Sequence, residues 1–571
     1  MKRDIRGLAN GYFDLLIVGG GIYGAAAAWD ATLRGLSVAL IDKADFAGAT
    51  SANSLKIIHG GLRYLQQADL RRMRESIRER TALLRIAPHL VHPLPVIVPT
   101  YGHGLRGREV FAAALLFNDL ISRDRDGLAD PDKRLPPGRL LTRQECLELL
   151  PGLPDEGLTG AALFYDAQVY NSERLVLSFL RSAAAAGAQV ANYVEAVGPL
   201  MRGNRVVGVE AEDVLSGQRL AIRARVVLIA AGPWLSSVLR AFDGKRLGLG
   251  IRSAKAVNVV TRQLFQTHAV GLHVHGAPAD EGGAAGPGGQ LLFIAPWRGC
   301  SLIGTVYEVH EGDPDRLGTS DEAADSLFNL INRAYPAAGL CSEDIRLVHR
   351  GLLPMTSPPR AGGRVCLARH SQIYDHRAAG VHGLLSILGV KYTTARGVAE
   401  MAIDQVFRLQ GKEPPPSMSA ATALHGGHIE RFGAFLNAET RRTLLGLPES
   451  VIRPFLQNYG SAYGDVLRYL DRTNGGHAPL TQMALLRAET RHAVHLEMAQ
   501  KLADVVFRRT ELGTAGYPGD VALATCAAEM GRELAWSAAR IRQELDETRG
   551  LFPQRDSVGG ATAARVAAEA V

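Results

Sequence analysis

The segment Asp14-Leu-Leu-Ile-Val-Gly-Gly-Gly-Ile-Tyr-Gly24 predicts a nucleotide-binding turn near the start of the chain. The apolar residues before the glycines are typical of a buried parallel strand, and a helix is expected over 25–34. Gly19 permits the tight turn, Gly21 lets the backbone approach a phosphate, and Gly24 lets the helix pack closely on the strand. The free N–H groups at the start of that helix would bind a pyrophosphate.

The second strand of this unit is expected to end at Asp42, where a carboxylate would bind the ribose 2′-hydroxyl, with Lys43 beside it. No second glycine fingerprint of this quality follows, whereas an enzyme that uses both NAD and FAD usually needs two. The polar segment Ala49-Thr-Ser-Ala-Asn-Ser-Leu-Lys56 carries the hydroxyls of Thr50 and Ser51, which suit a ribityl chain and a pyrophosphate. The sequence therefore favours FAD over NAD.

A second glycine turn, His59-Gly-Gly-Leu-Arg-Tyr64, follows this polar segment. It would bring backbone and basic side chains to the reactive ring of the same cofactor, with Gly60 and Gly61 in contact with it. His59 is either a base, an orienting group or a structural residue of the turn, and the sequence leaves these roles open.

Two later strands run into turns of small residues, where a backbone can approach a cofactor. The first is Ala230-Ala-Gly-Pro-Trp234, which places Gly232 at the turn. The second is Gly389-Val-Lys-Tyr-Thr-Thr-Ala-Arg396, which carries Lys391 and Thr393 ahead of a predicted helix over 397–409. We expect a second phosphate or ring contact there.

Composition sets the outer limits of the function. The 571 residues are 47% hydrophobic and 21% charged, as in ordinary globular proteins of two to four domains. The net charge of +7 is compatible with an anionic substrate, an anionic membrane surface or a solvated basic surface. Aromatic residues are only 6% and do not interleave with the basic ones, so nucleic acid is not an expected partner.

The cysteines, at positions 146, 300, 341, 366 and 526, form no C-x-x-C pair, which indicates reduced thiols in a cytoplasmic protein and no metal site. Met1-Lys-Arg3 resembles the start of a signal peptide, but the uncharged stretch 15–29 is already explained as strand, turn and helix. No apolar run reaches the ~20 residues of a membrane span. Any membrane contact is therefore expected to be peripheral, on the inner face of the cell membrane.

We predict an α/β fold with interleaved domains. A Rossmann-like FAD-binding domain is joined by a β-rich substrate domain and a C-terminal α-helical domain. The expected boundaries are 1–90, 160–250 and 370–411 for the first domain; 91–159 and 251–369 for the second; 412–419 for a linker; 420–552 for the helical domain; and 553–571 for a disordered tail.

Two helices are predicted with particular features. A helix over 70–86 carries six arginines, which form either a charged, solvated face or a contact with anionic lipid headgroups. A long helix over 480–509 carries His492 and His495, which are interpreted as ordinary surface or core histidines rather than as a metal pair.

These motifs resemble the FAD-dependent glycerol-3-phosphate dehydrogenase family of the aerobic type, which has a glutathione-reductase-like cofactor domain and a D-amino-acid-oxidase type of substrate domain. The resemblance covers nearly the whole chain. It rests on Gly19–Gly24, Ala49–Ser51, Lys56-Ile-Ile-His-Gly-Gly-Leu-Arg-Tyr-Leu65, Gly232–Trp234, Gly389–Thr394 and Arg508-Arg-Thr-Glu-Leu-Gly513.

The resemblance implies oxidation of sn-glycerol 3-phosphate to dihydroxyacetone phosphate, with hydride transfer to the flavin and electrons passed to a quinone or to oxygen. It places Arg63, Tyr64, Arg369 and Lys391 in the substrate pocket. Arginine suits bidentate phosphate binding, and lysine acts as a point charge. His59, Arg63 and Lys391 are predicted to carry the catalysis.

The chain departs from the family pattern at the alcohol end of this pocket. Leu353 stands where the family has an arginine, and Leu55 stands where it has serine or threonine. Val306-Tyr307 replaces threonine and aspartate. In a strand, His349 shares the face of Leu353 whereas Arg350 points the other way, so His349 is a further candidate for substrate binding.

These departures leave alternatives open. The first is an FAD-dependent oxidoreductase acting on a different phosphorylated hydroxy or amino compound with a larger or more apolar end. The second is a non-catalytic flavin-binding subunit, which the retained cations at Arg63, Arg369 and Lys391 argue against. The sequence does not decide between a monomer and a dimer.

Overall fold

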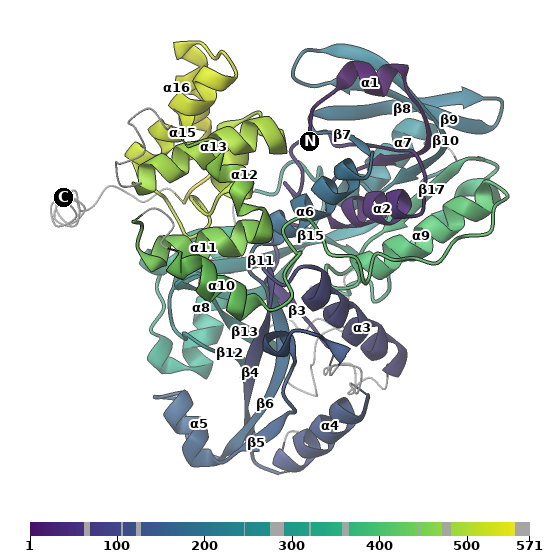
Figure 1. Cartoon of the computed structure of the whole chain (residues 1–571). Coiled ribbons are helices and arrows are strands. Elements are labelled where there is room, and N and C mark those ends of the chain that lie inside the picture. Colours follow the sequence, from purple (N-terminus) through teal and green to yellow (C-terminus); the bar gives the residue numbers. More distant parts are fainter. Residues whose placement is uncertain are drawn as a thin grey trace.

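The computed structural model describes residues 1–61, 69–103, 107–121, 127–244, 246–274, 290–318, 321–356, 365–442, 446–470 and 481–553. Two sheets and a group of C-terminal helices make up this part of the chain (Figure 1). The expected tail lies outside the described residues from 554 onward. The predicted α/β class with a C-terminal helical domain is confirmed.

The first sheet carries the nucleotide-binding turn. Its strands run in the order β16-β17-β10-β1-β2-β7, and β9 and β8 extend it from β10. β1 pairs in parallel with both β2 and β10, as the apolar run before the glycines predicts. The strands are β1 Tyr12–Val18, β2 Val38–Ile41, β7 Gln189–Ala191, β8 Val194–Arg202, β9 Arg205–Asp213, β10 Gln218–Ile229, β16 Gln372–Asp375 and β17 Leu384–Leu388.

Helices cover both faces of this sheet (Figure 1). α2 (Ile22–Leu33) packs between α6 (Ser172–Ala185) and α9 (Ala395–Leu409) on one face. α1 (Ile5–Asn10) and α7 (Leu235–Asp243) contribute apolar side chains to the core of the other face. α2 is rich in buried alanines, and such small side chains let three helices approach one another closely.

The second sheet is mostly antiparallel, in the order β15-β11-β14-β13-β12-β4-β6-β3, with β5 paired to β6. It runs downward from the first sheet in Figure 1, with α3, α4 and α5 around its lower part. The strands are β3 Ile57–Ile58, β4 Val91–Tyr101, β5 Arg139–Leu141, β6 Leu158–Val169, β11 Arg252–Arg262, β12 Ala269–Val274, β13 Gln290–Trp297, β14 Cys300–His310 and β15 Leu347–Met355. The helices are α3 Leu70–Ile86, α4 Arg108–Ile121, α5 Arg143–Leu149 and α8 Asp321–Ala334.

The C-terminal helices pack on the upper part of the second sheet (Figure 1). Leu502 and Val505 share a buried apolar cluster with Val260, Trp297 and Leu302 of that sheet. The helices are α10 Phe432–Arg441, α11 Glu449–Tyr459, α12 Tyr463–Leu467, α13 Gln482–Glu497, α14 Leu502–Asp504, α15 Asp520–Glu533 and α16 Ala538–Arg549.

The prediction of one helix over 480–509 is wrong. α13 ends at Glu497, and Met498 adopts a left-handed conformation with φ 57°. After α14 the chain forms a short π-helix, Val505–Arg509. The main chain at the break is held from outside, because the Asn192 amide donates to the carbonyl oxygen of Met498 at 2.8 Å. This tertiary contact outweighs the helical spacing of the apolar residues.

Among the described residues, no helix combines the length and the apolar character that crossing a membrane requires. The domain boundaries given above stay a prediction. The sheets themselves interleave along the chain, since β3 to β6 of the second sheet lie between β2 and β7 of the first, and β11 to β15 lie between β10 and β16.

Gly24 offers a test of the predicted close packing. A Cβ atom at this position would lie 1.9 Å from the carbonyl oxygen of Gly19, which is main chain and cannot move aside. We expect Gly24→Ala to lower the free energy of unfolding by about 2 kcal/mol or more, the usual cost of overpacking a core, and to reduce bound flavin. Chemical denaturation and the ratio of flavin to protein absorbance measure both effects.

The matched control is Gly464→Ala in α12, where a Cβ atom would meet nothing within 4 Å. Alanine in a helix is favoured over glycine by about 0.5–1 kcal/mol, so this variant should be at least as stable as the parent. Equal stability of the two variants would contradict the close approach at Gly24.

Candidate active site

Two neighbouring cavities form the candidate site. The larger, of about 900 Å³, lies at the carboxyl ends of β1, β2 and β10, and the smaller, of about 170 Å³, adjoins it. The larger cavity brings together the predicted cofactor residues Gly19, Gly21, Asp42, Lys43, Thr50, Ser51 and Gly232. Both cavities are lined by Ser54, Leu55, Tyr307, Leu353, Pro354, Val390, Lys391 and Tyr392, which form their common wall.

The first glycine turn is shaped as a cradle for an anion. A Cβ atom at Gly19 would lie 2.5 Å from the carbonyl oxygen of Ala230, and the residue has φ +113°. The N–H of Ile22, at the start of α2, donates to Ser51 Oγ at 3.0 Å. The exposed N–H groups of a helix start, with a positive dipole end and a hydroxyl beside them, suit a pyrophosphate. Only glycine fits this close approach, as the sequence predicts.

Asp42 lies at the end of β2, as predicted, and lines the larger cavity. Its Oδ2 accepts from the N–H of Gly20 at 2.6 Å, and its Oδ1 accepts from the N–H of Ala44 at 2.9 Å. Burial raises the pKa of the Asp42 carboxyl to about 6. Lys43 lines the same cavity, but its Nζ binds Asp315 at 2.6 Å and lies 4.5 Å from the ring centre of Trp234.

The polar segment after β2 is tied to the second sheet. Thr50 Oγ1 donates to the carbonyl oxygen of Leu352 at 3.0 Å and accepts from its N–H at 3.1 Å. The segment thereby forms one side of the larger cavity, where the sequence predicts contacts with a ribityl chain. The residues present fit FAD, because a glycine cradle, a carboxylate and this hydroxyl-rich side line one elongated space of a volume typical of ligand sites.

Tyr23 is a site residue that the sequence reasoning missed. Its hydroxyl donates to the carbonyl oxygen of Lys391 at 2.8 Å and accepts from the N–H groups of Val390 and Lys391, both at 3.0 Å. A Cβ atom at Gly389 would lie 2.3 Å from the Tyr23 ring. The tyrosine of the first glycine turn thus fixes the main chain at Lys391 against the start of α2. The position of Tyr23 within the glycine fingerprint, directly before Gly24, is the sequence signal that could have identified it as a site residue.

The second glycine turn is held by a buried carboxylate. The N–H of Gly60 donates to Asp166 Oδ1 at 2.6 Å, and Arg80 donates to the same oxygen at 2.6 Å. A Cβ atom at Gly60 would lie 2.0 Å from the Arg80 guanidinium, so glycine is required there. Gly61 has φ +87°. The turn is therefore built around the Arg80–Asp166 pair.

His59 lies between this pair and the smaller cavity. Its Nδ1 is 3.5 Å from Asp166 Oδ2, and its side chain is 31% exposed. Burial alone would raise the pKa of Asp166, but the contacts with His59 and Arg80 hold that pKa below its ordinary value. A carboxylate on one ring nitrogen fixes the orientation of an imidazole and directs the other nitrogen elsewhere.

The smaller cavity is cationic on one side. Arg369, Lys391 and Arg72 line it, and none of its described lining residues is an aspartate or a glutamate. Thr393, predicted to contact the cofactor, is buried and lines this cavity too. Arg63 and Tyr64 lie outside the described residues.

The arginines of α3 do not all form a solvated face. Arg72 and Arg80 are buried, and they turn toward the smaller cavity and toward Asp166 respectively. Arg71, Arg74 and Arg78 are exposed. The helical spacing separates the two sets, because the exposed arginines recur three or four residues apart on one face of α3, whereas Arg72 and Arg80 lie on the buried face. On that face an arginine needs a carboxylate or an anion site from the rest of the fold.

Part of the common wall is apolar, at positions where the sequence departs from the family pattern. Leu353, Leu55 and Tyr307 line both cavities. Arg350 does not replace the expected arginine, because its Nη1 donates to the carbonyl oxygen of Gly318 at 2.6 Å.

His349 lies on the larger cavity and not among the described residues that line the smaller one. It is buried, and its ring packs edge-on against Trp297 at 5.7 Å. Burial lowers the pKa of His349 to about 3, and the nearby Lys56 ammonium lowers it further. The imidazole is therefore neutral at physiological pH, and its predicted role in binding the substrate stays a prediction.

The buried ion pair Lys56–Glu173 supports the polar segment after β2. Lys56 Nζ donates to both carboxylate oxygens of Glu173, at 3.0 and 3.1 Å, and to Ser172 Oγ at 2.7 Å. Burial lowers the pKa of Lys56, and the Lys56 ammonium keeps the pKa of Glu173 below its ordinary value against the effect of burial. This pair fixes the chain between Ser51 and the second turn. Sequence reasoning missed Glu173, for which no local signal exists.

Among the described residues, no group of three or more histidine, cysteine, aspartate and glutamate side chains is arranged to hold a metal ion. His492 and His495, which the sequence leaves as ordinary histidines, contact Arg181 and Glu533 respectively. The five cysteines are thiols, of which Cys146, Cys300, Cys366 and Cys526 are buried and Cys341 is exposed.

The fold and this site define an FAD-dependent oxidoreductase. Residues 14–399 match the family model described as FAD dependent oxidoreductase, and residues 417–541 match the C-terminal domain of alpha-glycerophosphate oxidase. The larger cavity, with its glycine cradle and Asp42, fits the cofactor of this class.

Within this class, the chain belongs to the glycerol-3-phosphate dehydrogenase family. It is 33% identical to glycerol-3-phosphate dehydrogenase of Synechocystis sp., over 95% of this chain and 97% of that protein. It is 32% identical to the enzyme of Mycobacterium leprae, over 93% of this chain and 87% of that protein. The mitochondrial enzyme of Rattus norvegicus is 29% identical over 95% of this chain and 73% of its own length.

The fold is also that of a solved relative. The crystal structure of the Bacillus halodurans glycerol-3-phosphate dehydrogenase, complexed with FAD, superposes with a TM-score of 0.74 at 24% identity, and the match covers 96% of both chains. The predicted fold class and cofactor are thereby confirmed.

The raised pKa of Asp42 predicts a pH-dependent affinity for FAD. The ordinary pKa of aspartate is 3.8, whereas the folded value is about 6, so the folded apoprotein holds the proton more tightly than the unfolded chain. This group therefore favours the fold as pH falls from 6 toward 4. Ribose hydroxyls, however, would donate to the ionised carboxylate. We expect the dissociation constant for FAD to rise below pH 6, by up to about tenfold per pH unit.

Fluorescence titration of the apoprotein with FAD between pH 5 and pH 8 measures this effect. Asp42→Asn should bind FAD more weakly at pH 7.5 and should lose the change between pH 7 and pH 5. An unchanged affinity of the parent protein from pH 5 to pH 7.5 would rule out the contact of Asp42 with the ribose.

Proposed function

We propose that the protein oxidises sn-glycerol 3-phosphate to dihydroxyacetone phosphate in an FAD-dependent reaction, and that the electrons then pass to a quinone or to oxygen. The observation that carries this proposal is the smaller cavity. It adjoins the FAD site, is lined by Arg369, Lys391 and Arg72, and has no carboxylate among its described lining residues. Such a space favours a small anion placed next to the cofactor. The choice of sn-glycerol 3-phosphate as the substrate rests on the relatives, which are named glycerol-3-phosphate dehydrogenases.

Different side chains bind the substrate, remove its proton and exclude water in this reaction. Arg369 and Lys391 bind the phosphate, and the fixed main chain at Lys391 holds the ammonium at a constant distance from the FAD site. His59, oriented by Asp166, removes the proton of the substrate hydroxyl through its other ring nitrogen. The chemistry that FAD supplies when bound is acceptance of a hydride from the carbon that carries this hydroxyl. The apolar residues of the common wall, Leu55, Leu353 and Tyr307, exclude water from this step.

A second candidate substrate is favoured by Leu353, Leu55 and Tyr307 on the common wall. These side chains offer apolar surface where a small polyol would present hydroxyls. A phosphate ester of a hydroxy or amino compound with a larger apolar end would bury hydrocarbon there, at about 25 cal/mol per Å². Both candidates use the same cations and the same reaction type.

Anaerobic reduction of the bound flavin distinguishes the candidates. We expect sn-glycerol 3-phosphate to bleach the flavin absorbance band, and we expect an alkyl-substituted hydroxy phosphate to do so more slowly. Lys391→Met should retain FAD but need at least about tenfold more substrate for half-maximal reduction, because one charge-assisted contact is lost. Stopped-flow absorbance at increasing substrate concentration measures the reduction.

The reverse order of the two substrates would replace the first candidate with the second. Lack of bleaching by either compound, in protein that dithionite still reduces, would contradict the proposed reaction. Reoxidation of the reduced flavin by air or by a soluble quinone then identifies the acceptor.

We further propose a peripheral contact with an anionic membrane at the end of the second sheet where α3 and α4 lie (Figure 1). Leu116 on α4 is 74% exposed, and Val110 and Phe117 on the same helix are also exposed. Arg71 and Arg74 on α3 are exposed as well. Exposed apolar side chains beside arginines are typical of helices that lie in the headgroup region of an anionic bilayer. A membrane-bound quinone would then be within reach.

Cosedimentation with vesicles that contain anionic phospholipid tests this contact. Leu116→Asp is expected to reduce the bound fraction severalfold, because it places a carboxylate against the headgroups. The control is Val521→Asp on α15, where an apolar side chain is 72% exposed on the C-terminal helical domain. An equal loss in both variants, or no binding of the parent protein, would argue against the contact.

A further inference from the structure

We infer that Arg508, in the C-terminal helical domain, is an FAD-binding residue at the adenosine end of the cofactor site, and that Asp45 is its positioning residue. Arg508 and its neighbour Phe507 belong to the π-helix after α14, and both line the larger cavity. The cofactor site is therefore completed by a segment that is more than 400 residues away from Asp45 along the chain.

Asp45 is the point where the C-terminal domain meets the first sheet. Its carboxylate accepts from Arg508 Nε at 2.5 Å and from Arg509 Nη1 and Nη2, both at 2.7 Å. The Asn192 amide donates to it at 2.9 Å. The Asp45 side chain is buried, and Arg508 and Arg509 hold the pKa of its carboxyl low, at about 2, against the effect of burial. The carboxylate is therefore ionised at every physiological pH.

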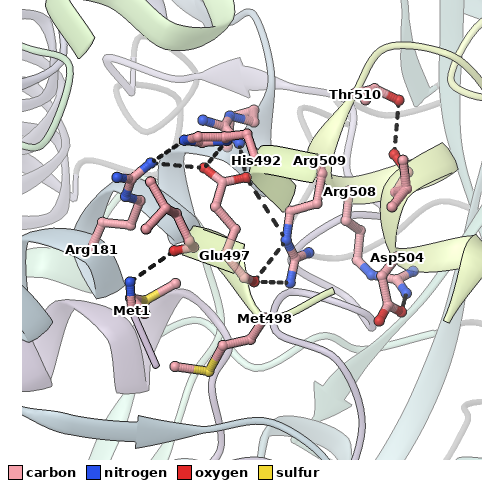
Figure 2. Close-up of polar contacts among 12 residues, drawn as sticks. Met1, Arg181, His492, Glu497, Met498, Asp504, Arg508, Arg509 and Thr510 are labelled. Atoms are coloured by element: carbon pink, nitrogen blue, oxygen red, sulfur yellow. Dashed lines mark hydrogen bonds and ion pairs between the residues drawn. The ribbon is translucent and has the colours of Figure 1, made fainter. Parts of the chain in front are cut away.

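Arg508 is held from two sides. Its Nε binds Asp45, and its Nη2 donates to Asp504 Oδ1 at 2.6 Å. Figure 2 shows Arg508 beside Asp504, while Arg509 turns to the main chain of Glu497. The Arg508 side chain remains 15% exposed and lines the cavity, whereas Arg509 is fully buried and does not. Two carboxylates thus fix the guanidinium plane and leave its Nη1 edge for a ligand.

The cluster around Arg508 is balanced in charge. It contains the carboxylates of Asp45, Asp465, Glu497 and Asp504 and the guanidinium groups of Arg174, Arg181, Arg508 and Arg509. His492 adds no charge, since burial lowers its pKa to about 3. Arg508 therefore attracts the phosphates of FAD through its place on the cavity wall, and not through a net charge of the cluster.

The position of Asp45 points to the adenosine end. The chain from Asp42 to Asp45 follows the end of β2, and Ala44 donates its N–H to Asp42 while its carbonyl accepts from Tyr193. Tyr193 Oη in turn donates to Asp504 at 2.7 Å. The carboxylate predicted to bind the ribose and the carboxylates that hold Arg508 are therefore joined through one short segment. The flavin end lies elsewhere, at the wall that Lys391 shares with the smaller cavity.

Arg508→Gln tests the inference on the full chain. Asp45 would keep its two bonds from Arg509, and Asp504 would keep those from Tyr193, Gln500 and Lys501, so the variant leaves neither carboxylate unpaired. We expect the dissociation constant of the apoprotein for FAD to rise about tenfold or more, the usual effect of losing a charge-assisted hydrogen bond. Asp45→Asn, which releases the guanidinium without removing it, should give a smaller rise.

Half-cofactors show where the contact lies. ADP and FMN are each used to compete with FAD in the same fluorescence titration. In Arg508→Gln the affinity for ADP should fall by a factor similar to that for FAD, whereas the affinity for FMN should stay as in the parent protein. Arg508→Lys keeps the charge but cannot bridge both carboxylates, so its effect should lie between those of the parent protein and the glutamine variant.

The control is Arg181→Gln. Arg181 also joins the first sheet to the C-terminal domain, through Glu497 at 3.2 Å, but it does not line either cavity. We expect this variant to lower the melting temperature and to leave the affinity for FAD within twofold. An unchanged affinity in Arg508→Gln, an equal loss in Arg181→Gln, or an equal loss for FMN would each overturn the inference. None of these outcomes depends on which substrate the enzyme oxidises.

Discussion

The carboxylate of Asp45 carries the main constraint of this structure, because it is buried, ionised and bonded to groups from two distant parts of the chain. Asn192, between β7 and β8, and the arginine pair Arg508–Arg509 of the C-terminal domain all donate to it. Burying a charge is costly unless every lone pair is matched, so these bonds exist only when the domains meet in one arrangement. The contact therefore specifies the arrangement of the domains more than it adds to their stability.

The two glycine turns follow the same principle, since each is completed by a residue that is distant in sequence. The first turn is joined to Lys391 through the Tyr23 hydroxyl, and the second is built on Asp166 with Arg80. The cofactor cavity and the smaller cavity consequently share a wall whose main chain is fixed at Lys391. A rigid wall between a cofactor and a substrate holds the reacting atoms at a constant separation, which is where much of the rate of such reactions originates.

The parts of the site that depend on local chemistry could be predicted from the sequence. The glycine cradle and Asp42 follow from sterics and spacing within one strand–turn–helix unit, and the structure places them as expected. The break after Glu497 could not be predicted, because an amide at Asn192 holds the Met498 carbonyl and no local pattern reports such a partner. What the buried Arg72 faces could not be predicted for the same reason, although helical spacing separates it from the exposed arginines of α3. An arginine turns inward only where another segment provides an anion or its binding site.

The smaller cavity separates affinity from selectivity. In the proposed reaction its cations would bind the phosphate that every candidate substrate carries, so they would contribute to affinity without distinguishing one ester from another. Discrimination falls to the wall formed by Leu353, Leu55 and Tyr307. A hydroxyl that faces this wall loses its water, and leaving such a group unpaired costs about 1–3 kcal/mol, whereas a methyl group gains from the same contact. In the proposed reaction these apolar residues, rather than the cations, would therefore decide between the two candidate substrates.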